Sequence, residues 1–403
     1  MLSRNVLFSK QSVGFVVTAI AVALGMLAGV AGPGRAQDKA AAPAKAWKDA
    51  QENQVGYDAS QEKDLTKKLA LLDKWKQQYP TTEYSEERQD MYLATYVGLN
   101  QPRQAFDTAQ EILKTRQFNI GALYNALLVV TTIKPAPSAA DLDAGEKIAT
   151  TVLDNPGVFA NSNKPANVSA ADWAKTADTL KPYATKVLFA IYQTRFAQSK
   201  DNKRAIDDFT KFLRRDGTYA QASYQLGGAM LAQIKATNTL QDQPQAFFHL
   251  ARAAAFDTAP NALDAKTRQQ IQAYLTTLYT NFHGTNQGLP ELLALAKTNV
   301  FPPGDYKIKS NVEIAQEKAA AEDAARAKDP LFYMWTHDIK EGLLKDANLW
   351  SSVMGAELPG PDPSDKSDKP APRFFKAKII SRRWPLCWNS NARISTRMME
   401  PSF

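Results

Sequence analysis

Three histidines are the side chains best suited to acid–base chemistry near neutral pH: His249, His283 and His337. Only His337 has an acidic neighbour at helical spacing, Glu341, and one histidine with one carboxylate supplies too few ligands for a zinc site. The signatures of zinc proteases, serine hydrolases, phosphate-binding loops and dinucleotide-binding folds are absent from the sequence. We therefore predict no catalytic residue, no metal site and no cofactor.

Neighbouring carboxylates occur at Asp207-Asp208 and Glu86-Glu87, within stretches of helical periodicity. Paired acids can perform general acid–base work, but on a helix they usually belong to its solvated face. Cys387 is the one cysteine in the chain, which excludes an intramolecular disulfide and a cysteine-based zinc site. These residues therefore do not favour an enzyme.

The formal net charge of +8 is concentrated at the two ends of the chain. Residues 1–36 hold three basic residues and no acid, and residues 373–403 hold seven basic residues against Glu400. The body between these ends is nearly neutral. A nucleic-acid-binding domain is expected to carry excess positive charge in its folded part, so the pattern disfavours a nucleic-acid partner.

The N-terminal segment has the layout of a secretory signal peptide. Arg4 and Lys10 precede an uncharged, mostly apolar run over Ser12–Gly32, and small residues follow it. This pattern predicts cleavage between Ala36 and Gln37 and export to the periplasm or beyond. The apolar run is also nearly long enough to span a membrane, so an uncleaved inner-membrane anchor facing the periplasm is the alternative, and the only predicted membrane contact.

From about residue 62 to residue 300 the apolar residues recur at spacings of three and four, which predicts an all-α fold. Turn residues such as Pro80, Asn155-Pro156 and Asp216-Gly217 separate the helical stretches, which come in pairs. Strand-like alternation is hard to find in this region.

Several of these pairs resemble the tetratricopeptide repeat. The second helix of that repeat carries a small residue, a large apolar one four later and another small or apolar one three after that, and Ala144, Ile148 and Thr151 have this spacing. In the first helix, Leu226-Gly227 matches the Leu-Gly pair of the repeat. The resemblance assigns repeat-packing roles to Ala105, Ala144, Ala205, Phe209, Gly227 and Ala246.

The resemblance implies an α-solenoid of antiparallel helix pairs that binds a partner in a groove lined by first helices. The repeat register then gives Asp90, Thr194, Tyr224 and Gly228 as partner-binding candidates. The predicted function is an exported interaction scaffold or assembly adaptor for another envelope or secreted protein. A small-molecule or glycan-binding module using Trp335 and Trp350 is the alternative, and an enzyme is least favoured. The oligomeric state is not indicated.

The domain organisation is predicted as follows. A signal peptide (1–36) precedes a leader and the start of the first helix (37–61), with 37–47 expected to be mobile. The repeat domain covers 62–300, capping helices cover 301–357, with a solvated helix at Asn311–Lys328, and a Pro/Ser/Asp linker covers 358–372.

The basic tail at 373–403 differs in composition from everything before it. Phe374–Ile380 has β character, and the tail is interpreted either as a truncated or frame-shifted β module or as a natural basic tail that contacts a membrane or partner.

Overall fold

The computed structural model describes residues 45–165, 168–338, 341–342 and 345. All regular secondary structure within these residues is helical, which confirms the all-α prediction. They divide into two compact units. The first holds the described residues up to Thr280 together with Thr285–Lys307, and the second holds Asn281–Gly284 and the described residues from Ile308 onward.

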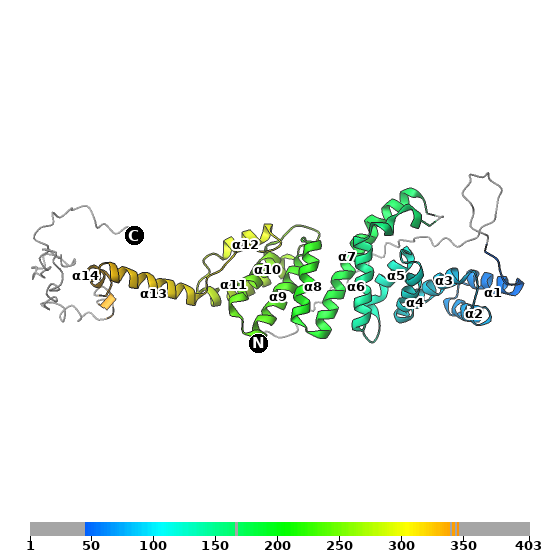
Figure 1. Ribbon diagram of the computed structural model, residues 1–403, viewed down its shortest axis with the longest axis horizontal. Helices are drawn as coiled ribbons and strands as arrows, with labels where there is room; N and C mark the ends of the chain where they lie inside the picture. Colours follow the sequence, from blue (N-terminus) through cyan, green and yellow to red (C-terminus); the bar gives the residue numbers. More distant parts are fainter. Residues whose placement is uncertain (1–44, 166–167, 339–340, 343–344, 346–403) are drawn as a thin grey trace, which may run out of the picture. The chain divides into compact units, whose positions relative to one another are not determined.

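The first unit is built from helices that follow one another in pairs (Figure 1). The odd-numbered helices are called first helices, and the even-numbered ones second helices. The first helices are α1 (Ala50–Gln61), α3 (Ser85–Gly98), α5 (Ile120–Val129), α7 (Ala170–Ser199), α9 (Ala220–Thr237) and α11 (Ala265–His283), whose last residues, from Asn281 on, belong to the second unit. The second helices are α2 (Leu65–Gln78), α4 (Pro102–Thr115), α6 (Ala139–Asp154), α8 (Asn202–Arg215), α10 (Gln243–Ala255) and α12 (Leu289–Thr298).

The principal contacts join neighbours along the chain. Each helix from α2 to α9 packs on the helix before it and the helix after it. Contacts two helices apart join α3 to α5, α5 to α7 and α10 to α12. A helix in this arrangement is covered from two sides and keeps part of its circumference free.

Local sequence explains where many of these helices begin and end. Asp64, Asn119 and Ser138 start their helices with side chains that accept hydrogen bonds from free backbone N–H groups. Three first helices end beside a residue in the left-handed conformation, with φ of 54° at Asn100, 53° at Lys200 and 56° at Asn238. This conformation turns the chain sharply into the next segment.

The second helices carry much of the apolar core. Ala105 and Ala109 of α4 and Phe209 of α8 are completely buried, and Ala205 is 2% exposed. On α6 the close packing falls at Gly145, one residue after the expected Ala144, which is only half-buried. A Cβ added at Gly145 would lie 2.8 Å from Val130 Cγ2 and 3.0 Å from Ile191 Cδ1. Gly145 therefore permits the approach of α6 to its neighbours.

Gly227 has the same role between α9 and α10. A Cβ at this position would lie 3.0 Å from Leu250 Cγ and 3.1 Å from the carbonyl oxygen of Ala246, which is itself fully buried. The next residue, Gly228, is exposed, and a Cβ there would meet nothing within 4 Å. Two adjacent glycines thus face opposite environments.

The segments α3–α4–α5 and α7–α8–α9 repeat each other at an offset of 100 residues. The second helices span 102–115 and 202–215, and left-handed residues precede both. The hydroxyl of Tyr92 donates to Asp73 of α2 at 2.8 Å, and that of Tyr192 donates to Glu146 of α6 at 2.9 Å. In both places a first helix is hydrogen-bonded to the preceding second helix in the same way.

A buried arginine ties three helices of this core together. The side chain of Arg195 on α7 is 5% exposed and donates to Asp208 of α8 at 2.7 Å and to Glu146 of α6 at 2.6 Å. It also contacts Asp143, which the exposed Arg204 shares. Burial raises the pKa of the Asp208 carboxyl above its ordinary value, so its ionisation depends on Arg195.

One segment differs from the sequence-based expectation. Trp47, assigned to a mobile leader, stacks on Tyr84 with ring centroids 3.7 Å apart, and Tyr84 donates to the carbonyl of Lys45. An aromatic contact that composition did not reveal therefore holds this segment against the helices.

The second unit contains α13 (Asn311–Lys328), the short α14 (Pro330–Tyr333) and a π-helical turn over Met334–Asp338. No residue of α13 is buried, which agrees with the expected solvated helix. Its first turn is closed by Ser310 and Glu313, which cap each other's backbone N–H groups.

Several predicted segments lie outside the described residues. They are the signal peptide and its Ala36–Gln37 cleavage point, most of the leader, the linker and the basic tail, and the role of 301–357 as a cap also stays a prediction. Among the described residues, no helix combines the length and apolar character needed to cross a lipid bilayer.

The adjacent glycines of α9 give opposite predictions. Gly227→Ala is expected to lower the free energy of unfolding by about 1–3 kcal/mol, because the new methyl group overlaps Leu250 and the Ala246 carbonyl. Gly228→Ala is expected to raise it by about 0.5–1 kcal/mol, because alanine is the better helix former and the site is open. Urea unfolding followed by circular dichroism measures both, and equal effects would contradict the described packing.

Removal of the buried arginine is expected to be far more costly than removal of its exposed neighbour. Arg195→Met leaves Asp208 and Glu146 without their partner and should destabilise the fold by about 3–5 kcal/mol. Arg204→Met, which loses only an exposed pair with Asp143, should cost about 1 kcal/mol or less. The midpoints of chemical unfolding compare the two, and a small loss for Arg195→Met would refute the structural role of this cluster.

Candidate interaction surface

Two first helices present matching uncharged surfaces. On α5, Gly121 is exposed and Tyr124, Asn125 and Leu128 are half-buried. The last three residues follow Gly121 by three, four and seven positions, a spacing that places all four on one side of the helix. Position for position, 100 residues later, α9 presents Gln221, Tyr224, Gln225 and Gly228, of which the first and last are exposed and the other two half-buried.

Tyrosines of the intervening and following first helices extend these surfaces. Tyr183 of α7 lies beside Tyr124, with ring centroids 5.5 Å apart. Tyr274 of α11 is 43% exposed and lies near enough to Tyr224 to influence its ionisation. The eight positions on α5 and α9, with Tyr183 and Tyr274, are called the first-helix face.

The pKa values of two tyrosine hydroxyls of this face, those of Tyr183 and Tyr224, are raised. Burial, helped by Tyr124, raises the pKa of the Tyr183 hydroxyl to about 12. Burial also raises the pKa of the Tyr224 hydroxyl, with a smaller contribution from Tyr274. Within the described residues no hydrogen bond engages the hydroxyls of these four tyrosines, so each can donate to a ligand.

Charged side chains gather on α4 and α8 instead. Both α4 and α8 carry charged residues along one outer side, and these residues occupy equivalent positions 100 residues apart. The equivalent positions are Arg103/Lys203, Asp107/Asp207, Glu111/Lys211 and Lys114/Arg214. Many are satisfied locally, as in the ion pairs Lys114–Glu111 and Lys211–Asp207. By contrast α5 contains no charged residue, and α9 contains only Lys235, in its last turn.

Two of the predicted partner-binding residues already have internal partners. The carboxylate of Asp90 accepts hydrogen bonds from both terminal nitrogens of Arg116, at 2.9 and 2.8 Å, and this ion pair neutralises the charge of Asp90. The hydroxyl of Thr194 donates to the carbonyl oxygen of Ala190 within α7. Tyr224 and Gly228 lie together on α9, whereas Asp90 and Thr194 are on α3 and α7.

Sequence reasoning passed over Tyr124, Tyr183 and Tyr274. For Tyr124 a signal was present, because Tyr124 and Tyr224 are separated by the same interval as Ala105 and Ala205. Tyr183 and Tyr274 had no such signal, since their placement depends on the unusual length of α7 and on the packing of α11.

The three histidines are dispersed among unrelated environments. His249 is 2% exposed within α10, His283 contacts the carbonyl of Lys309, and His337 stacks on Tyr333 at 4.6 Å. No cluster of three or more potential metal ligands occurs among the described residues.

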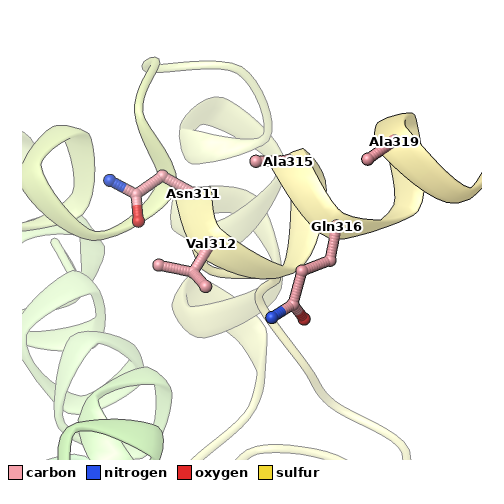
Figure 2. Close-up of a pocket in the computed structure, with 5 residues that line it drawn as sticks. All are labelled: Asn311, Val312, Ala315, Gln316 and Ala319. Atoms are coloured by element: carbon pink, nitrogen blue, oxygen red, sulfur yellow. The ribbon is translucent and has the colours of Figure 1, made fainter.

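A shallow open hollow follows one side of α13 in the second unit. Figure 2 shows its lining residues: Asn311, Val312, Ala315, Gln316 and Ala319. The hollow is formed by one exposed helix and has no charged side chain and only two amides at its edge. It therefore lacks the convergent polar groups that orient a small ligand.

Comparison with known proteins does not assign a family. No protein-family model matches the chain, and no curated protein matches it either.

The buried His249 predicts a pH-dependent stability. Burial, and secondarily Arg252, lower its pKa to about 4, against an ordinary value of 6.5. Because the unfolded chain then binds the proton more readily, the neutral imidazole favours folding above pH 6.5, and this contribution is lost as the pH falls towards 4. Relative to His249→Leu, the wild-type protein should lose about 1–3 kcal/mol of unfolding free energy over this interval.

Chemical unfolding at a series of pH values measures this difference. The His249→Leu protein is the reference for the wild-type protein, because all other titrating groups are the same in both. A constant difference between the two proteins from pH 7 to pH 4 would show that His249 is protonated equally in both states.

Proposed function

We propose that this chain is an exported helical-repeat protein, similar to tetratricopeptide-repeat proteins, that binds a segment of another envelope or secreted protein on its first-helix face. The chain acts as a scaffold or assembly adaptor in this proposal. Its predicted signal peptide supplies the export, and its binding requires no cofactor or metal.

The packing pattern supports the repeat-type fold. Helices alternate between first and second members, and their principal contacts reach one or two helices along the chain. Small residues lie at close approaches, with Gly227 against Ala246 and Leu250 as the clearest case. The pattern of helices also repeats after 100 residues, an interval that contains two successive helix pairs.

The segregation of charge is the observation that carries the functional proposal. A purely structural, solvated helix surface is expected to carry charged residues, as the outer sides of α4 and α8 do. The matched faces of α5 and α9 instead combine half-buried tyrosines with amides and glycine. Tyrosine and adaptable amide groups are enriched where proteins contact other proteins.

Site-specific photocrosslinking in the full-length protein tests this proposal. A photoreactive residue at Gln221 or Gly228 is expected to capture one or two defined envelope proteins in living cells. The matched controls are Lys203 and Lys211, which are exposed on α8. Tyr224→Ala should reduce capture at Gln221 by about fivefold or more, because a central aromatic contact is worth at least about 1 kcal/mol.

Capture from the α8 positions with the same partners and yields would contradict the proposal. So would capture at Gln221 that Tyr224→Ala and Tyr124→Ala leave unchanged while the proteins remain folded.

A further inference from the structure

We propose that the end of the first unit carries an acid-sensitive latch, in which protonation of the buried His249 releases residues 299–306 and the end of α12 from α10. These residues are called the return segment, because they follow α12 and lie back against α10 and the turn between α8 and α9. The latch is a conformational device and does not depend on the proposed binding surface.

Two apolar contacts seat the start of the return segment. Val300 lies against Gly217 in the turn between α8 and α9, so closely that a Cβ added at Gly217 would overlap it. The ring of Phe301 meets that of His249 edge-on, with ring centroids 5.8 Å apart. His249 is only 2% exposed. The return segment therefore forms part of the cover that keeps water from this imidazole.

Arg252 ties the same segment to the helices. This residue is 3% exposed, and its guanidinium donates to the carbonyl oxygens of Ala296 at 3.1 Å and Asn299 at 2.9 Å. It donates as well to the carbonyl of Gly217. The first two acceptors lie at the end of α12, where helix carbonyls lack partners of their own. Among the described residues no carboxylate pairs with Arg252, so carbonyl dipoles alone compensate this buried cation.

His249 lies one helical turn before Arg252 on α10. Its Nδ1 atom is buried and has no hydrogen-bond partner in the described part of the chain. Phe248 and Phe301 form two walls of the site, and Tyr306 of the return segment lies 5.5 Å from Phe248 between ring centroids. A neutral imidazole suits such apolar surroundings. Protonation would add a second cation beside Arg252 with no acceptor for the Nδ1 proton, and movement of the return segment would expose both cations to water.

The elements packed against α10 bring no compensating charge to His249 within the described structure. Burial and, secondarily, Arg252 lower its pKa to about 4. The acids of these elements are exposed or bonded elsewhere; they are Asp216, Asp242, Asp257, Glu291 and Asp305. Their bases and tyrosines, which cannot offset a cation at acidic pH, include Tyr224, Lys235, Arg268, Tyr279, Lys297 and Tyr306.

The direction of the pH effect follows from the two forms of the latch. In the open form the imidazole is exposed and has its ordinary pKa of 6.5, whereas in the closed form the pKa is about 4. The closed form is therefore fully favoured above pH 6.5, and it loses this advantage as the pH falls towards 4.

The first three helices offer a matched comparison. The buried Arg88 of α3 also donates to carbonyl oxygens at the end of a helix, those of Tyr79 and Pro80 after α2. Residues 45–98 contain no histidine. Between pH 7 and pH 5 this part of the chain therefore has no imidazole to protonate and should stay closed.

Hydrogen–deuterium exchange of the full-length protein at pH 7 and pH 5, corrected for intrinsic exchange rates and measured by mass spectrometry, tests the latch. In the wild-type protein, protection of peptides from residues 289–306 should fall about tenfold or more at pH 5, because only the open form binds the proton readily. Peptides from residues 85–98 should change by less than about twofold. The His249→Gln protein cannot take up this proton and should show no selective loss in 289–306.

A second variant tests the clamp separately. Arg252→Lys keeps the positive charge but cannot reach all three carbonyls, so protection of 289–306 should already be about tenfold lower at pH 7, with 85–98 unchanged. Protection of 289–306 that stays constant between pH 7 and pH 5 would overturn the proposal. An equal loss in 289–306 and 85–98, or the same selective loss in the wild-type and His249→Gln proteins, would overturn it as well.

Discussion

Close helix approach at small residues is the constraint on which the rest of the first unit depends. Gly145 lies against Val130 and Ile191, and Gly227 lies against Leu250 and the Ala246 carbonyl, at distances that leave no room for a side chain. These contacts bring α6 close to α7 and α10 close to α9, and in the same unit large side chains such as Phe209 and Phe212 of α8 are fully buried. Each helix therefore commits a fixed part of its circumference to the core, and what remains is available for solvent or for a ligand.

That remaining surface differs between α4 and α8 on one side and α5 and α9 on the other. The outer sides of α4 and α8 are charged and often paired, which keeps them solvated and discourages association. The faces of α5 and α9 carry no charge, although nothing in the packing requires this of exposed or half-buried positions. The buried cluster around Arg195 serves a separate purpose, because it fixes α6, α7 and α8 together through charges that face inward. These charges serve solvation and the core, whereas in the proposed function tyrosine and amide groups contact the partner.

The helical periodicity and the spacing of small residues were sufficient to predict the all-α fold and the burial of residues such as Ala205 and Ala246. They could not resolve Ala144 from Gly145, because a one-residue change of register rotates the contact by about 100°. The Arg195 cluster was beyond prediction, since Asp143 and Glu146 lie about fifty residues away along the chain. Trp47 was misassigned to a mobile leader because its partner Tyr84 is brought to it only by the packing of α2 and α3. Of the first-helix face, Tyr224 and Gly228 were predicted from the resemblance, whereas Tyr183 and Tyr274 needed the arrangement of the helices in space.

The central claim is that a ligand covers the first-helix face. Hydroxyl-radical footprinting of the full-length protein, with oxidation of individual tyrosines read by mass spectrometry, tests it most directly. Saturation with a partner protein captured at Gln221 is predicted to suppress oxidation of Tyr274 and Tyr224 while leaving Tyr57, which is 59% exposed on α1, unchanged. Equal oxidation of Tyr224 and Tyr274 with and without the bound partner would contradict the account.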